Sequence, residues 1–105
     1  MELKRVVVTG LGALTPIGNN VDEYWESLIN GKSGAAPITQ FDASLFKTQF
    51  ACEVKNFDVE AHMDRKEARK LDQFSQYAMV SAKEAVADSE ILNSDPNLDR
   101  IGVIW

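Results

Sequence analysis

The sequence has one cysteine and one histidine, Cys52 and His62, among its 105 residues. A single cysteine forms no internal disulfide, which excludes the disulfide-built class of small secreted proteins, and a lone thiol is typical of a reducing compartment. Zinc sites need several His or Cys ligands at set spacings, and the sequence offers no second ligand near His62. We therefore expect a cytoplasmic protein without a metal site.

Long apolar runs and a surplus of positive charge are also missing. Lys4 and Arg5 precede an apolar stretch, but Gly10 and Gly12 interrupt it and no small-residue cleavage site follows, so a secretion signal is not indicated. No run approaches the roughly 18 apolar residues of a membrane-spanning helix. Eleven basic against sixteen acidic residues give a net charge of -5, whereas nucleic-acid binding needs a basic surplus. We expect a soluble protein with neither a membrane nor a nucleic-acid partner.

The first third of the sequence predicts a strand followed by a helix. Residues 5–9 form a short β-branched run closed by Gly10, which is typical of a strand buried on both faces. Asn20 can cap a helix, with Glu23 three residues later as in a capping box. Gly31 supplies the expected end of that helix.

The middle of the sequence alternates between irregular and ordered patterns. Residues 32–48 are rich in turn formers and predict an irregular excursion, and residues 50–54 have the character of one strand in a small antiparallel pair. Residues 58–62 predict a short helical turn. Asp64 can then cap a second helical stretch that runs through Lys70.

The strongest helical signal comes next, from apolar residues at three- and four-residue steps: Leu71, Phe74, Tyr77, Ala78, Ala82, Ala85 and Val86. Residues 93–97 form a turn cluster, and residues 100–105 predict a second buried strand. The order strand, helices, strand predicts an α/β fold with a parallel, right-handed crossover. Two principal strands leave a sheet short of partners, so we expect residues 1–105 to be one part of a larger domain, without an internal boundary.

The glycines after the first predicted strand invite a dinucleotide-binding interpretation. In that motif, Gly10 and Gly12 would be followed by a third Gly or Ala at position 15, where Thr15 stands, and Pro16 replaces the start of a helix. The short-chain dehydrogenase pattern fails as well, because Leu14 and Pro16 occupy its later glycine positions. We keep an NAD(P)-binding domain as a minor alternative and expect no cofactor.

The two potentially reactive side chains have ordinary structural interpretations. Cys52 lies in a strand-like stretch beside an acidic residue, without the cationic or basic neighbour that activates a thiol, so a packed structural thiol is favoured over a nucleophile. His62 lies at a helix junction next to Met63 and Asp64. This position favours a surface or capping role.

Four of the eleven basic residues fall within six positions: Arg65, Lys66, Arg69 and Lys70. If this stretch is helical, they share one broad face and leave Ala68 and Leu71 for packing. Two interpretations stay open. The residues form a solvated charged face, or they dock an acidic protein, since a local potential can steer a partner despite the opposite net charge.

The motif Arg5-Val-Val-Val-Thr-Gly-Leu-Gly-Ala-Leu-Thr-Pro-Ile-Gly-Asn19 resembles the N-terminal signature of the β-ketoacyl-[acyl-carrier-protein] synthases, synthase II in particular. Further similarity follows in the same order along nearly the whole chain, at residues 30–34, 37–42, 64–77 and 100–105. The resemblance implies a thiolase-like fold of two similar α/β halves in alternating layers, usually as a homodimer. The chain would be the N-terminal part of the first half.

The resemblance also implies fatty-acid chain elongation by an acyltransferase. Family members condense acyl-[acyl-carrier-protein] with malonyl-[acyl-carrier-protein], with loss of CO2, to give 3-oxoacyl-[acyl-carrier-protein]. Their nucleophilic cysteine and two histidines lie beyond position 105, so Cys52 and His62 do not inherit those roles. No catalytic residue is expected within this chain, and the segment alone is expected to be inactive.

One functional element of the family falls within this chain. By resemblance, Lys66, Arg69 and Lys70 correspond to basic residues that contact the acidic carrier protein, with Arg65 a weaker candidate. The alternative from another functional class is a small binding module that docks an acidic protein through the same helix.

Overall fold

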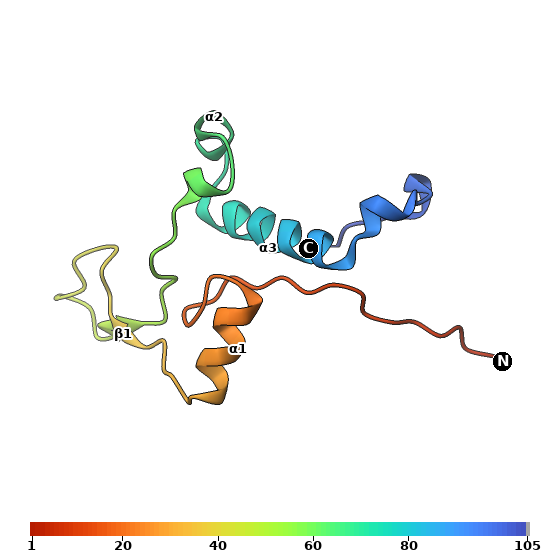
Figure 1. Ribbon diagram of the computed structural model, residues 1–105. Helices are drawn as coiled ribbons and strands as arrows, with labels where there is room; N and C mark the ends of the chain where they lie inside the picture. The colour runs from red at the N-terminus through yellow and green to blue at the C-terminus, as the bar shows by residue number, and fades with distance from the viewer. Residues whose placement is uncertain (105) are drawn as a thin grey trace.

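The computed structural model describes residues 1–104 and shows an open arrangement around one long helix, α3 (Gln73–Ser89) (Figure 1). The radius of gyration is 17.5 Å, against about 13 Å for a compact chain of 100 residues. The accessible surface is 9059 Å², against roughly 5,900 Å² for a compact protein of this mass. The chain therefore buries much less of itself than an independent domain of its size does.

The first helix, α1 (Val21–Ile29), begins and ends where the sequence predicts. The side chain of Asn20 accepts a hydrogen bond from the backbone N–H of Glu23 at 2.9 Å. The carboxylate of Glu23 reaches back one residue further than in a standard capping box and accepts from the backbone of Asn19 at 2.8 Å. Beyond the helix, Gly31 has φ +64°, the left-handed conformation that ends helices.

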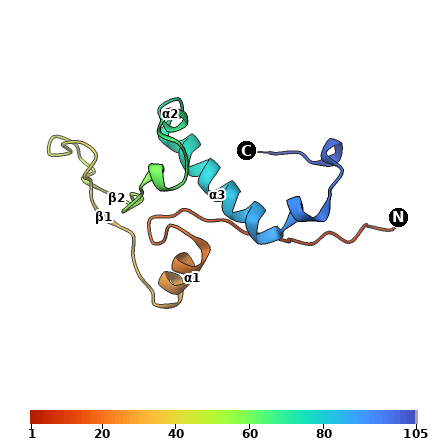
Figure 2. The same cartoon turned by 45° about the horizontal axis from the view of Figure 1, so that its top comes forward.

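A small antiparallel pair joins β1 (Ala36–Pro37) to β2 (Phe50–Ala51), with Ala36 opposite Ala51. The two strands lie side by side in Figure 2. The predicted strand-like stretch at 50–54 is thus confirmed over its first two residues. Its partner lies inside the segment that we expected to be irregular.

Two short helical elements precede α3: the 3₁₀ turn η1 (Val59–Ala61) and α2 (Arg65–Ala68). Both are predicted, but α2 ends at Ala68 rather than at Lys70. The cause is a tertiary contact, since the side-chain amide of Gln76 donates to the backbone carbonyl of Ala68 at 2.9 Å. That carbonyl also accepts a hydrogen bond from the backbone N–H of Leu71 at 3.2 Å, which closes a turn one residue tighter than an α-helical turn.

Helix α3 follows the predicted periodicity and ends at Ser89, where the next residue, Glu90, has the left-handed φ of 55°. The predicted turn cluster at 93–97 connects the 3₁₀ helices η2 (Ile91–Ser94) and η3 (Leu98–Arg100). The closing segment of the described chain then runs in extended conformation.

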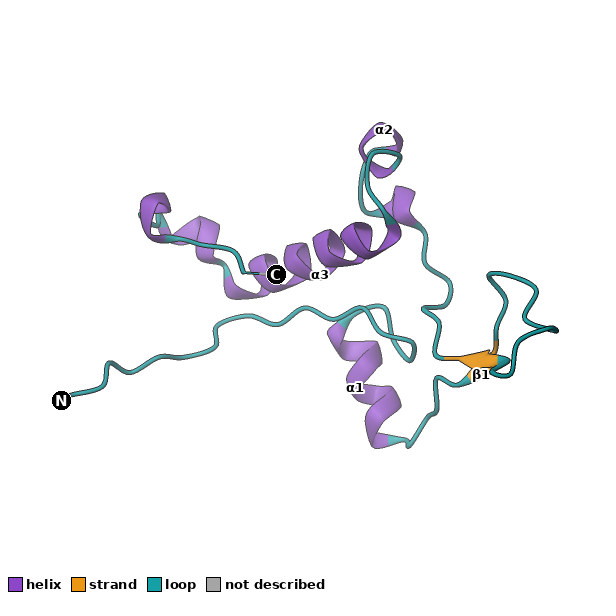
Figure 3. Ribbon diagram, turned by 180° about the vertical axis from the view of Figure 1, so that it is seen from behind, coloured by secondary structure: helices purple, strands orange, loops and turns teal. Residues whose placement is uncertain are grey.

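The two principal strands expected at 5–9 and 100–105 are not formed. Within residues 1–104, β1 and β2 make the whole of the regular sheet, seen in orange in Figure 3, so the expected parallel crossover is absent there. Trp105 lies outside the described residues. A strand needs a neighbour about 4.8 Å away to take its hydrogen bonds, and none lies beside the N-terminal run, where Val6 is 88% exposed.

A small core lies where α2 and the start of α3 meet. Met63, Ala68 and Val80 are buried there, and the partly buried residues packed on them are Leu14, Phe57, Val59 and Leu71. Apolar side chains of α1 are uncovered, because Trp25 and Ile29 are both more than half exposed. The core thus supports the α2 region, while many large apolar side chains elsewhere in residues 1–104 are exposed.

Candidate functional site

The predicted docking residues lie together on α2 and the turn that follows it. We call this set the basic patch: Arg65, Lys66, Arg69 and Lys70. All four are exposed, while Ala68 between them is only 5% exposed. The predicted division of this stretch into a packed side and a charged side is therefore present.

Local hydrogen bonds and the core together hold the basic patch in place. The carboxylate of Asp64 accepts from the backbone of Lys66 at 3.2 Å, and the backbone carbonyl of Asp64 accepts from Ala68 at 2.9 Å. Ala68 belongs to the same buried cluster as Met63 and Val80. The turn is thus anchored on its inner side, which leaves the basic side chains directed away from the core.

The charges of the basic patch are mostly not neutralised by neighbours. Arg65 pairs with Glu60 at 3.4 Å, and both side chains are largely exposed, so the pair contributes little to stability. Among residues 1–104, no ion pair involves Lys66, Arg69 or Lys70. These three cations are available to an external acidic group, whereas Arg65 already has a partner.

The glycines that suggested a dinucleotide site have a packing role instead. A Cβ atom on Gly12 would collide with the backbone carbonyl of Ser81, and one on Gly10 would collide with that of Ala85, both in α3. The backbone N–H of Leu11 donates to the carboxylate of Asp88 at 3.0 Å. The glycines therefore let the N-terminal segment lie against α3, and the amide between them is bound to an acidic side chain.

Cys52 and His62 are not brought into a reactive arrangement. Cys52 is a free, exposed thiol directly after β2, so the packed thiol that we expected is wrong for this structure. His62 ends η1, and its ring stacks on Phe57 with centroids 5.8 Å apart, which confirms a surface and capping role. Across residues 1–104, no group of three or more His, Cys, Asp or Glu side chains is placed to hold a metal ion.

Two pKa shifts report on packing rather than on chemistry. The hydroxyl of Thr39 donates to Glu53 at 2.8 Å and lowers the pKa of that carboxyl. Burial raises the pKa of the Tyr77 hydroxyl, and the ring of Tyr77 lies edge-on to Phe57 at 5.1 Å. Neither group lies in the basic patch.

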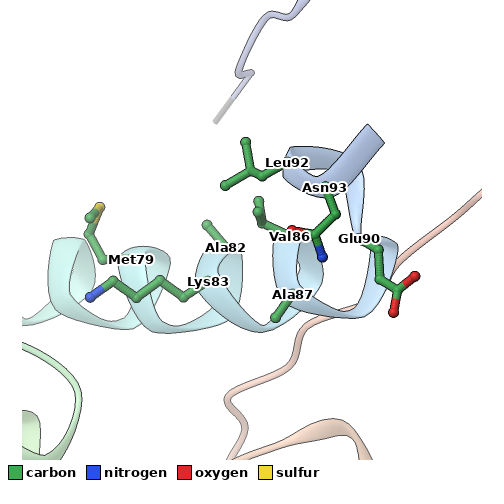
Figure 4. Close-up of a pocket in the computed structure, with 8 residues that line it drawn as sticks. All are labelled: Met79, Ala82, Lys83, Val86, Ala87, Glu90, Leu92 and Asn93. Atoms are coloured by element: carbon green, nitrogen blue, oxygen red, sulfur yellow. The ribbon is translucent and has the colours of Figure 1, made fainter. Parts of the chain in front are cut away.

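A hollow of about 450 Å³ lies between α3 and η2 (Figure 4). Its walls are mostly apolar, with Lys83 toward one end and Glu90 toward the other in the view of Figure 4. It is lined by Met79, Ala82, Lys83, Val86, Ala87, Glu90, Leu92 and Asn93. The lining contains no cysteine, histidine, serine or threonine.

Among the helices of residues 1–104, none has the length and apolar character that a membrane span requires.

Sequence reasoning missed two lysines that organise the structure. The ammonium of Lys55 donates to the carbonyls of Pro16, Gly34 and Glu53 at 3.2, 2.9 and 3.1 Å. The ammonium of Lys83 donates to the carbonyl of His62 at 2.9 Å. Neither lysine stands in a local motif, and their partners are mostly far away in sequence, so no sequence signal could have found them.

Comparison with known proteins shows the family to which the chain belongs. The family profile described as beta-ketoacyl synthase, N-terminal domain, matches residues 3–105. The 3-oxoacyl-[acyl-carrier-protein] synthase 2 of Synechocystis sp. is 47% identical over 104 residues, which cover 99% of this chain and 25% of that protein. The protein of the same name from Coxiella burnetii is 50% identical over 103 residues, which cover 98% and 25%. The chain thus spans about a quarter of the length of these relatives.

A solved structure shows a similar arrangement of the backbone. The ishigamide ketosynthase/chain length factor aligns with a TM-score of 0.71 at 37% identity, over 85% of this chain and 22% of that one. The open arrangement of the helices and the short strand pair is therefore also found within a much larger protein.

Proposed function

The chain belongs to the β-ketoacyl synthase N-terminal domain family, and we propose on that basis that it is part of a condensing enzyme of fatty-acid elongation. The resemblance noted in the sequence is thereby confirmed at the level of the family. The observation that carries the proposal is the match over residues 3–105 together with about 50% identity to synthases of one name. The view of the chain as a separate binding module receives no such support.

The proposed reaction joins two carrier-bound acyl groups. A cysteine thiolate of the enzyme attacks the acyl thioester of the carrier protein. The carrier protein leaves as a free thiol, and the acyl group is then held as a thioester on the enzyme cysteine. Malonyl-[acyl-carrier-protein] then loses CO2, and the resulting carbanion attacks that thioester. The enzyme thiolate is released with 3-oxoacyl-[acyl-carrier-protein], which is two carbons longer. Donors that stabilise the developing negative charge are needed for both steps, and we place these donors and the nucleophile outside residues 1–105.

The architecture of the whole protein is proposed in the same way. We place this chain in the N-terminal half of a thiolase-like layered α/β fold, in a cytoplasmic homodimer. The large exposed surface of the chain supports this, since the apolar side chains of α1 and of the N-terminal run need a covering that the chain does not supply.

Within that protein, the basic patch is proposed to dock the acyl carrier protein. Lys66, Arg69 and Lys70 carry charges that no neighbour in the described chain neutralises, on a turn anchored to the core. Arg65 contributes less because it already pairs with Glu60 at 3.4 Å. Charges of this kind direct encounter and orientation more than they add affinity, which suits a carrier that must leave after each cycle.

The activity is tested on the full-length protein with acyl- and malonyl-loaded carrier protein. We expect one CO2 released for each 3-oxoacyl product detected by mass. A full-length protein that releases no CO2 and forms no longer product would contradict the proposed function.

The docking role is tested with the Lys66→Glu, Arg69→Glu double variant. We expect carrier-protein affinity to fall at least tenfold at low salt, because two attractive contacts become repulsive. The matched control is Lys32→Glu, Lys47→Glu, which makes the same change of net charge outside the patch. Equal affinities for the two double variants would remove the basic patch from the docking site.

A further inference from the structure

A second hollow, of about 310 Å³, lies beside the basic patch between the α2 turn and α3. Its lining combines apolar and charged side chains: Met63, Glu67, Lys70, Leu71, Met79 and Lys83. Lys70 is shared with the basic patch, so the hollow continues that surface. It has an apolar floor with cationic groups beside it.

Lys83 brings a cation to this hollow from a distant part of the sequence. Its ammonium donates to the backbone carbonyl of His62 at 2.9 Å, which fixes where the charge lies. Figure 4 shows the side chain running along α3 toward Met79. Long side chains on helices point back toward the helix N-terminus in this way. The charge is therefore held on the side of α3 that faces the basic patch.

The apolar part of the hollow is open within residues 1–104. Of the two methionines that line it, Met79 is 47% exposed and Met63 is only 8% exposed. Methionine side chains are flexible and adapt their shape to the group that they contact. The two methionines therefore give the hollow an apolar surface that an apolar side chain can contact.

We propose that this hollow extends the docking surface and receives an apolar side chain from an acidic helix of the partner. The inference rests on the proposed docking of an acidic carrier protein at the basic patch. Charge complementarity determines the choice of occupant, because two cations, Lys70 and Lys83, and one acidic group, Glu67, line the hollow beside its apolar residues. An amphipathic helix with an apolar residue between carboxylates at three- and four-residue spacing matches this arrangement.

One acidic group in the lining refines the expected geometry. Glu67 also lines the hollow and repels a carboxylate placed above it. The partner's acidic residues are therefore directed toward the lysines, and its apolar residue toward Met79. This fixes the side from which the helix enters.

The experiment measures binding of purified holo acyl carrier protein to the full-length protein by titration calorimetry. Removing the Met79 side chain by Met79→Ala is expected to weaken binding about fivefold, from the loss of buried apolar area. Charge reversal by Lys83→Glu is expected to weaken it about tenfold or more. The matched controls are Leu45→Ala, an exposed apolar residue away from the hollow, and Lys32→Glu.

The Lys83→Glu variant also breaks the bond to His62, so Lys83→Arg is measured beside it. Arginine keeps a positive charge and hydrogen-bond donors and is expected to bind the carrier protein within about twofold of the unchanged protein. Unchanged circular dichroism and Tm verify that each variant is folded. Equal losses for Lys83→Arg and Lys83→Glu would indicate a purely structural role and overturn the proposal.

The possible outcomes separate this inference from the proposed function. If Lys66→Glu weakens binding while Met79→Ala and Lys83→Glu do not, the basic patch docks the carrier and the hollow does not. If none of the three has an effect, both proposals fail. If Lys83 in the free full-length protein already resists acylation by a lysine reagent, the protein's own chain or a second copy covers the hollow, and the proposal is overturned.

Discussion

Replacing Gly12 by alanine tests the contact between the N-terminal segment and α3. The added Cβ would collide with the backbone carbonyl oxygen of Ser81 and would lie 3.0 Å from the backbone nitrogen of Ala85. Both atoms belong to the helix backbone, which moves only if the helix or the segment shifts. Overpacking of this kind costs about 1–3 kcal/mol.

The assay is thermal unfolding of the full-length protein. A loss of about 2 kcal/mol lowers Tm by about 2–5 °C in a large protein. The matched control is Gly31→Asn, because a Cβ at Gly31 meets nothing within 4 Å and asparagine tolerates the left-handed φ of +64°. If Gly12→Ala unfolds at the same temperature as Gly31→Asn, the packing role of Gly12 is refuted.

Three further predictions concern single side chains. Asn20→Ala removes the cap of α1 and is expected to cost about 1 kcal/mol, measured as a lower Tm than that of Asn30→Ala. Lys55→Met is expected to lower Tm and Lys55→Arg to lower it less, because the ammonium joins three carbonyls; equal values would contradict this. The pKa of Glu53 is lowered in the folded state, so its stabilisation is present above the pKa of the unfolded carboxyl and is lost as pH falls below about 4.3. Wild type and Glu53→Gln should therefore differ in Tm at pH 6 and converge near pH 3, and a constant difference would disprove the cause given.

Elements set by local chemistry were predictable from the sequence. Asn20 and Glu23 determine the start of α1 through side-chain hydrogen bonds to backbone groups three and four residues away in sequence. Gly31 determines its end. Helix α3, which is 17 residues long, follows from the repeat of apolar residues between Leu71 and Val86. In each of these cases the pattern and the physical cause lie within a few residues of each other.

Elements that depend on distant partners were not predictable in the same way. The run at 5–9 has strand-forming residues, but a strand exists only beside another strand, and residues 1–104 place none there. The end of α2 at Ala68 depends on Gln76, eight residues later. For the candidate site, the four charges of the basic patch were predictable from their adjacency in the sequence. Lys83 lines the same hollow as Lys70 only because α3 packs beside the α2 turn, which the sequence pattern does not show.

The uncovered N-terminal run has a consequence for the synthesis of the protein. Ribosomes add about 5–20 residues per second. In a protein as long as the Synechocystis relative, of which this chain spans 25%, synthesis of the remainder would take roughly tens of seconds after this segment is made. Throughout that interval, Val6 and Val8 expose apolar side chains on a backbone without a strand partner, which is a surface that promotes aggregation. The net charge of -5 opposes self-association of such nascent chains. Crosslinking of ribosome-bound chains of this length to a chaperone through positions 6–8 would detect the exposed run.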